Sequence, residues 1–71
     1  MKYLITMTKQ GGKYAYVLTE SDYEAGGFVD ADEDNFSIDS IEEAKAIKEK
    51  LETYAKSKGD DFTEFFIDSV I

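Results

Sequence analysis

The sequence predicts a small α+β domain of ββαβ order, in which a three-stranded antiparallel sheet carries one helix on one face. Three patterns favour this class: two β-rich runs flank a glycine pair, a long amphipathic stretch follows, and an aromatic, β-branched run ends the chain. Because 71 residues suffice for only one hydrophobic core, we assign residues 1–71 to a single domain.

Residues 2–8 and 14–19 are rich in Tyr, Leu, Ile, Val, Thr and Met, and they predict a β-hairpin that turns at 9–13, around Gly11 and Gly12. Successive side chains of a strand point to opposite faces. The second run is apolar on both faces, with Tyr14, Tyr16 and Leu18 on one and Ala15 and Val17 on the other. This pattern indicates that one face of the sheet meets the helix and the other is partly covered.

The helix is predicted to begin after Asp39 or Ser40, either of which can act as N-cap with a glutamate three residues on. Gly59 is the expected C-terminal stop. The apolar stripe at helical period consists of Ile41, Ala44, Ile47, Leu51, Tyr54 and Ala55.

Residues 60–71 fit two patterns. A helical stripe would hold Phe62, Phe65, Phe66 and Val70, whereas a strand face would hold Phe65, Ile67 and Ile71. The aromatic and β-branched content favours a strand. A right-handed crossover then places this third strand beside the first, in the order 2-1-3.

The connection at residues 20–39 is the least regular segment. Its first part, Ser21–Glu24, predicts a single helical turn, after which Gly26 and Gly27 break the chain. A short extended piece follows at 28–29, and residues 30–35 predict an acidic turn. Phe28 and Phe36 are expected to be core residues.

Composition argues against several functions. Cys and His are absent, so the chain has no thiol nucleophile and no imidazole that could shuttle protons at physiological pH. The glycine pairs do not match phosphate-binding motifs, and a small domain has little room for a substrate cleft. We therefore expect no enzyme activity and no cofactor. The absence of disulfides favours a reducing, cytoplasmic setting, and no run is apolar enough for a signal peptide or a membrane span.

The charge pattern is the most informative feature. Net charge is −8, which argues against direct binding to nucleic acid or to an anionic membrane and favours a basic partner. Between Lys13 and Lys45 there are ten acids and no basic residue. The predicted partner-binding residues are seven of these acids and one aromatic anchor: Glu20, Asp22, Tyr23, Glu24, Asp30, Asp32, Glu33 and Asp34. A solvated, solubilising loop is the competing interpretation.

The segment Asp30-Ala-Asp32-Glu-Asp34 invites comparison with a calcium loop. Counted from Asp30, an EF-hand needs Gly at position 6 and Glu at position 12, but Asn35 and Ile41 occupy them. We therefore assign no metal site, and weak divalent-cation binding at 30–34 stays an alternative.

The Tyr-rich hairpin at 2–19, the polar connection that ends in Phe36-Ser-Ile-Asp-Ser-Ile-Glu-Glu-Ala44, and the Lys/Glu-rich helix together give the chain a resemblance. It resembles small acidic accessory proteins of bacteriophages and mobile elements, such as anti-restriction and anti-CRISPR proteins. The resemblance implies an inhibitor that imitates DNA phosphates and binds a host nucleic-acid-binding protein. The sequence thus predicts a non-enzymatic module that presents carboxylates to a basic protein surface. The alternative is a structural domain that forms a homodimer through a sheet edge.

Overall fold

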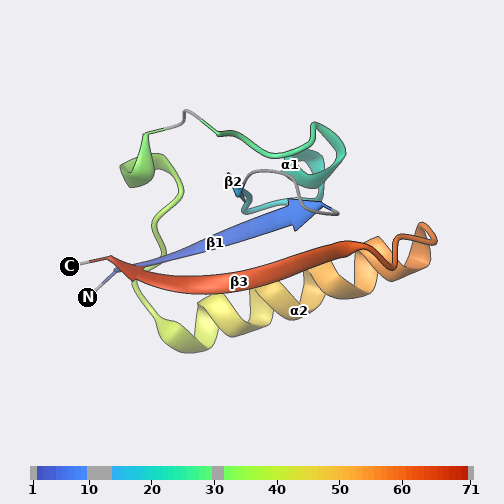
Figure 1. Cartoon of the computed structure of the whole chain (residues 1–71). Helices are drawn as coiled ribbons and strands as arrows, with labels where there is room; N and C mark the ends of the chain where they lie inside the picture. Colours follow the sequence, from blue (N-terminus) through green and yellow to red (C-terminus); the bar gives the residue numbers. More distant parts are fainter. Residues whose placement is uncertain (1, 10–13, 30–31, 71) are drawn as a thin grey trace.

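The computed structural model describes residues 2–9, 14–29 and 32–70, and it shows a three-stranded sheet with a long helix against one face (Figure 1). The strand order is β2-β1-β3, and both strand pairs are antiparallel. The elements are β1 (Lys2–Lys9), β2 (Ala15–Tyr16), α1 (Glu20–Glu24), the 3-10 turn η1 (Glu33–Asn35), α2 (Ile41–Ser57) and β3 (Thr63–Val70). The predicted fold class and strand order are confirmed, as is a strand within residues 60–71.

The core lies between the sheet and α2. In the β1–β3 register Ile5 pairs with Ile67 and Met7 pairs with Phe65, so the odd-numbered residues of both strands point to the same face. The buried residues of the resulting cluster are Ile5, Met7, Ala15, Val17, Tyr23, Ile38, Ala44, Leu51, Ala55 and Phe65. The predicted helical stripe supplies three of these residues and the hairpin four.

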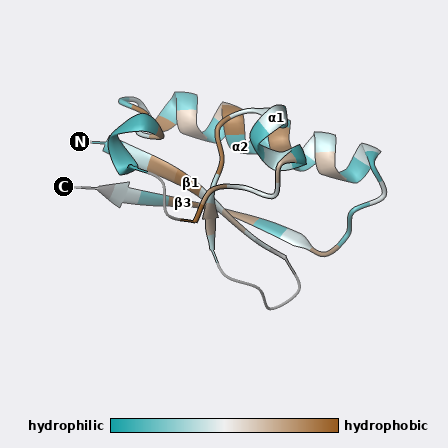
Figure 2. Ribbon diagram, turned by 90° about the horizontal axis from the view of Figure 1, so that it is seen from above, coloured by the Kyte–Doolittle hydropathy of each residue, from teal (hydrophilic) through white to brown (hydrophobic). Residues whose placement is uncertain are grey.

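Helix α2 begins and ends where the sequence predicts. Of the two candidate N-caps, Ser40 fills the role, because its side chain accepts a hydrogen bond from the Glu43 amide. Gly59 follows the helix with a φ of 79°, a left-handed conformation that suits glycine. The helix is banded between hydrophilic and hydrophobic residues (Figure 2), as an amphipathic helix should be. Within the described residues no helix has both the length and the apolar character needed to cross a membrane.

Strand β2 is shorter than predicted, since only Ala15 and Tyr16 pair with β1 rather than residues 14–19. The chain leaves the sheet after Val17, whose amide still donates to the Ile5 carbonyl at 3.1 Å, and the amides of Leu18 and Thr19 donate to the Asp22 carboxylate at 2.9 and 3.0 Å. The helical turn at 20–24 is confirmed, but its N-cap is Thr19 rather than a residue within 21–24. The predicted hairpin turn falls mainly on residues 10–13, outside the described part of the chain.

Two single bridges extend the sheet, one from β2 and one from β1. Tyr16 exchanges backbone hydrogen bonds with Phe28, and Tyr3 does so with Ile38. Ile38 thereby enters the core, but the side chain of Phe28 is 41% exposed and that of Phe36 is half-buried. The expectation that Phe28 is a core residue is wrong. Its bridge to Tyr16 places it on the same side of the sheet as Tyr16, away from α2.

Candidate protein-interaction surface

The sheet face opposite α2, called the open face below, carries an exposed aromatic surface. Alternation directs the even-numbered residues of β1 and β3 to this face, because the odd-numbered ones enter the core. The side chains of Tyr14 and Phe66 are 63% and 36% exposed, and Tyr16 is half-buried. The aromatic residues of the open face are Tyr14, Tyr16, Phe28, Phe36 and Phe66.

These rings form two contacting groups. Phe36 lies between Tyr16 and Phe28, with ring centroids 6.0 and 5.7 Å away, respectively. Tyr14 meets Phe66 edge-on, with centroids 5.8 Å apart and planes at 66°. The three centroid distances, and the tilts between the rings, are those of favourable aromatic pairs. The two groups flank the centre of β1, because Thr6 has Tyr16 as its partner on one side and Phe66 on the other.

Carboxylates border this aromatic surface on two sides. The turn η1 ends one residue before Phe36, and Glu33 and Asp34 are exposed within it. Asp32 caps the turn by accepting a hydrogen bond from the Asp34 amide at 3.0 Å. On the β3 side, Asp68 is exposed and accepts a hydrogen bond from the Thr6 hydroxyl at 3.4 Å. The open face therefore combines apolar area with negative charge.

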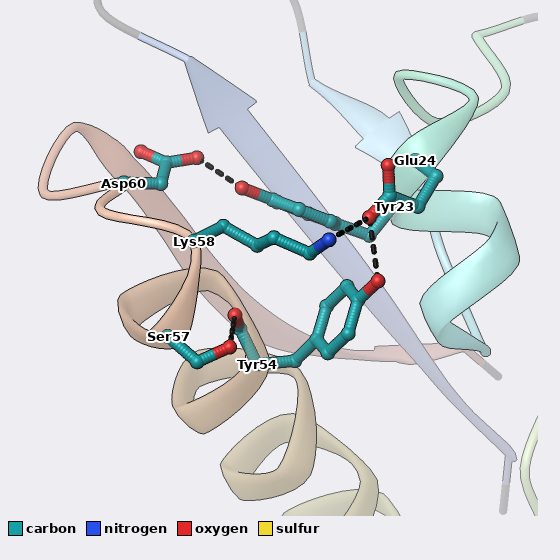
Figure 3. A network of polar contacts seen from close by, with 6 residues as sticks. All are labelled: Tyr23, Glu24, Tyr54, Ser57, Lys58 and Asp60. Atoms are coloured by element: carbon teal, nitrogen blue, oxygen red, sulfur yellow. Dashed lines mark hydrogen bonds and ion pairs between the residues drawn. The ribbon is translucent and has the colours of Figure 1, made fainter.

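The acids of α1 lie elsewhere and already have partners. Figure 1 draws α1 and the green turn η1 at opposite ends of their connection. Glu20 pairs with Lys50 of α2 at 3.6 Å. The Asp22 side chain completes the capping box of its own helix by accepting a hydrogen bond from the backbone amide of the N-cap residue. Glu24 lies 3.5 Å from the Lys58 amine and accepts the Tyr54 hydroxyl at 2.5 Å (Figure 3). The predicted binding residues that the structure describes therefore do not form one surface.

Tyr23, the predicted aromatic anchor, is a core residue. Its side chain is 7% exposed, and its ring packs against Tyr54 and Phe65. Its hydroxyl donates to the carboxylate of Asp60, in the turn between α2 and β3 (Figure 3). Burial, followed by this hydrogen bond, raises the pKa of Tyr23 to about 12. The ring therefore helps to hold α1 against α2, and a partner would not reach it without unfolding α1.

Two of the predicted acidic residues lie in η1, a third is its N-cap, and a fourth lies outside the described residues. Asp32, Glu33 and Asp34 are brought together beside Phe36, whereas Asp30 is not described. Among the described residues no group of three or more carboxylates is arranged to hold a metal ion. The aromatic residues Tyr14, Tyr16 and Phe66 were not predicted as binding residues. The signal that could have found them is the alternation that puts apolar side chains on both faces of each strand.

A hollow lies between the two helices, where α1 meets the outer side of α2. Its volume is about 510 Å³, and Glu20, Lys50 and Tyr54 are among the residues that line it. Glu49 also lines it, and the ion pair between Glu20 and Lys50 offsets part of its charge. Comparisons of the chain with protein-family models, with curated proteins and with solved structures gave no match.

Proposed function

We propose that this protein is a non-enzymatic binding module that uses its open face to hold a basic surface of another protein. The supporting observation is the juxtaposition of an exposed aromatic surface with the acids at η1, for which no ion pair is seen among the described residues. Exposed contiguous apolar area on a small domain typically marks an interaction site. Aromatic side chains supply much of the binding energy in protein interfaces.

The negative charge of the chain favours a partner with a positively charged surface. The chain carries sixteen acids against eight lysines, and the ion pairs of the described residues join acids to lysines of α2 or its C-terminal end. The acids of η1 form no ion pair among the described residues. A basic surface would therefore be attracted toward the open face over a distance of about a Debye length. A nucleic-acid-binding protein of a host cell is the kind of partner that fits this proposal.

The experiment compares two variants that each remove three negative charges. The first, Asp32→Asn/Glu33→Gln/Asp34→Asn, alters η1 beside the open face. The second, Glu43→Gln/Glu49→Gln/Asp61→Asn, alters exposed acids of α2 and the following turn. The wild-type chain and both variants are immobilised, exposed to cell lysate at low salt and eluted with increasing salt.

We expect the η1 variant to bind the most tightly held basic protein with roughly tenfold lower affinity than the wild type. The control variant should keep the wild-type affinity. Capture alone does not support the proposal, because any acidic protein attracts basic ones. Equal losses from both variants would show unspecific charge attraction. No loss from either would contradict a role for η1.

A second candidate function is self-association through β3. This eight-residue strand forms one edge of the sheet, with β1 on its other side. Unpaired backbone groups of an edge strand can pair with a second copy of the chain. Sedimentation at two concentrations tests this candidate, and a strictly monomeric species at both would end it.

A further inference from the structure

We propose that the hollow on the open face between Tyr14, Phe66 and Asp68 receives an arginine side chain of the basic partner. This inference rests on the proposed function and adds the chemical group that is recognised. The hollow has a volume of about 370 Å³ and is lined by Thr6, Tyr14, Phe66, Ile67 and Asp68. It therefore holds two aromatic rings and one carboxylate within a single depression.

The geometry of the rings suits a planar cation. Tyr14 and Phe66 meet edge-on with centroids 5.8 Å apart, and both residues line the hollow. A cation above the face of an aromatic ring is attracted by the ring quadrupole. The guanidinium group of arginine can stack on a ring and donate two hydrogen bonds to a carboxylate at the same time, which a lysine amine does not do.

The carboxylate is available for such a contact. Asp68 is exposed, and among the described residues its carboxylate accepts one hydrogen bond, the long one from the Thr6 hydroxyl at 3.4 Å. Among the described residues no lysine forms an ion pair with it. The Thr6 hydroxyl bonds Oδ2 of Asp68, which keeps the carboxylate beside the hollow and leaves the other oxygen as an acceptor.

The molecule contains the same combination of groups with its cation in place. On the opposite side of the domain, the Lys58 amine lies 5.3 Å from the centre of the Tyr54 ring and 3.5 Å from the Glu24 carboxylate (Figure 3). There an aromatic ring and a carboxylate hold a cation of the chain itself. On the open face the rings and the carboxylate are present, and the partner supplies the cation.

The test uses the full chain and a short capped Gly/Ser peptide with one central arginine. The matched probe replaces arginine by citrulline, which keeps the shape and removes the charge. Binding is followed by the NMR shifts of the Tyr14 and Phe66 rings and of the Asp68 amide. We expect saturable shifts of these groups with the arginine peptide and at least roughly fivefold weaker binding of the citrulline peptide.

Variants separate the ring and carboxylate contributions. Asp68→Asn and Tyr14→Ser are each expected to weaken binding of the arginine peptide by roughly fivefold to tenfold. Their controls are Asp61→Asn and Phe62→Ser, because Asp61 is exposed and the Phe62 side chain, 61% exposed, lies outside the hollow. Thermal unfolding of each variant confirms that it is folded before binding is compared.

The inference is overturned if the citrulline peptide binds equally well, if the shifts map to α2, or if the controls lose as much as the variants. Its failure is distinct from that of the proposed function. If a basic protein is captured through η1 but the arginine peptide does not bind in the hollow, only this inference is overturned and the proposed function is kept. Arginine binding in the hollow without η1-dependent capture overturns the role of η1 in the proposed function and leaves the hollow as the arginine site.

Discussion

The Tyr23 hydroxyl donates a hydrogen bond to the Asp60 carboxylate, and this contact joins α1 to the turn that leads into β3. The same carboxylate accepts the Phe62 amide at 2.9 Å, and the Thr63 amide and hydroxyl at 3.0 and 2.5 Å. Asp60 thus organises the start of β3 and holds a helix that is distant in sequence. In a domain of this size, such a contact between separate elements contributes a substantial share of the total stability.

We expect Asp60→Ala to lower the free energy of unfolding by about 2 kcal/mol, because several donors lose a charged acceptor at once. Tyr23→Phe removes one of these donors and is expected to cost about 1 kcal/mol. Urea unfolding of both single variants and of the double variant measures the coupling between the two side chains. If the two losses simply add, the hydroxyl and the carboxylate do not stabilise each other, which would contradict the geometry.

The same carboxylate predicts a pH dependence. Hydrogen bonds from Thr63 and Tyr23 hold the pKa of Asp60 well below its usual range. A depressed carboxyl pKa contributes stability that is fully present above the unfolded value of about 3.9 and is lost as the pH falls through the folded value. Acid also relieves repulsion among the other carboxylates, which acts in the opposite direction.

Comparison of the wild-type chain with Asp60→Asn separates these two effects, because only the wild type carries the Asp60 contribution. The difference in unfolding free energy between the two proteins should shrink as the pH is lowered below about 4. Unfolding by urea at several pH values measures it. A difference that stays constant down to the lowest accessible pH would show that Asp60 is stabilising for a reason other than its charge.

Two adjacent glycines provide a matched pair of substitutions. Gly26 and Gly27 both have a left-handed φ, of 88° and 78°. A Cβ at Gly27 would lie 2.5 Å from the Cβ of Ala15, whereas a Cβ at Gly26 would have no neighbour within 4 Å. Gly26→Ala should therefore cost only the conformational strain, about 1 kcal/mol.

Gly27→Ala should cost that strain and a further roughly 1–3 kcal/mol, since Ala15 is buried and has little room to move. Thermal or urea unfolding of both variants gives the two values. Equal losses would mean that β2 shifts freely to accept the extra methyl group, and that the close packing of Gly27 on the sheet is unimportant.

The parts of the fold that depend on local pattern were predictable. The period of the apolar residues, the Ser40 cap and Gly59 define α2, and alternation defines β1 and β3. The early end of β2 was not predictable from local pattern. It depends on competition between a sheet hydrogen bond and the Asp22 carboxylate for the amides of Leu18 and Thr19.

The candidate site was predicted less well, because sequence proximity does not give spatial proximity. Glu24 and Asp34 belong to one acidic interval, yet the first pairs with Lys58 and the second lies beside Phe36. The burial of two aromatic residues is the reverse of what we expected, because Tyr23 lies in the core and Phe28 is exposed. Both outcomes depend on how the connection at 20–39 crosses the sheet, which no local pattern specifies.

The structural role of Asp22 is itself testable. Because its carboxylate completes the capping box of α1, Asp22→Ala should lower the free energy of unfolding by about 1 kcal/mol. The same substitution should leave partner capture unchanged once the protein is folded. If Asp22→Ala weakens partner capture more than Glu49→Gln does, Asp22 contributes to partner binding as well as to the helix cap.

Salt separates the two contributions of the open face. The acids of η1 act through charge, so the affinity lost in Asp32→Asn/Glu33→Gln/Asp34→Asn should shrink as ionic strength rises and the Debye length falls to about 3 Å at 1 M salt. Phe28 is exposed and uncharged, so Phe28→Ser should lower the affinity by a factor that salt does not reduce.

The measurement is the dissociation constant of the captured basic protein for the wild type and both variants, at low and at high salt. Phe62→Ser is the control for Phe28→Ser, because Phe62 is also exposed but lies in the segment between α2 and β3, and among the described residues it makes no contact with the rings of the open face. If the loss from Phe28→Ser disappears with salt, its ring acts only by positioning the neighbouring acids. If Phe62→Ser loses as much, apolar contact with the partner is not confined to the open face, and the aromatic surface loses its proposed role.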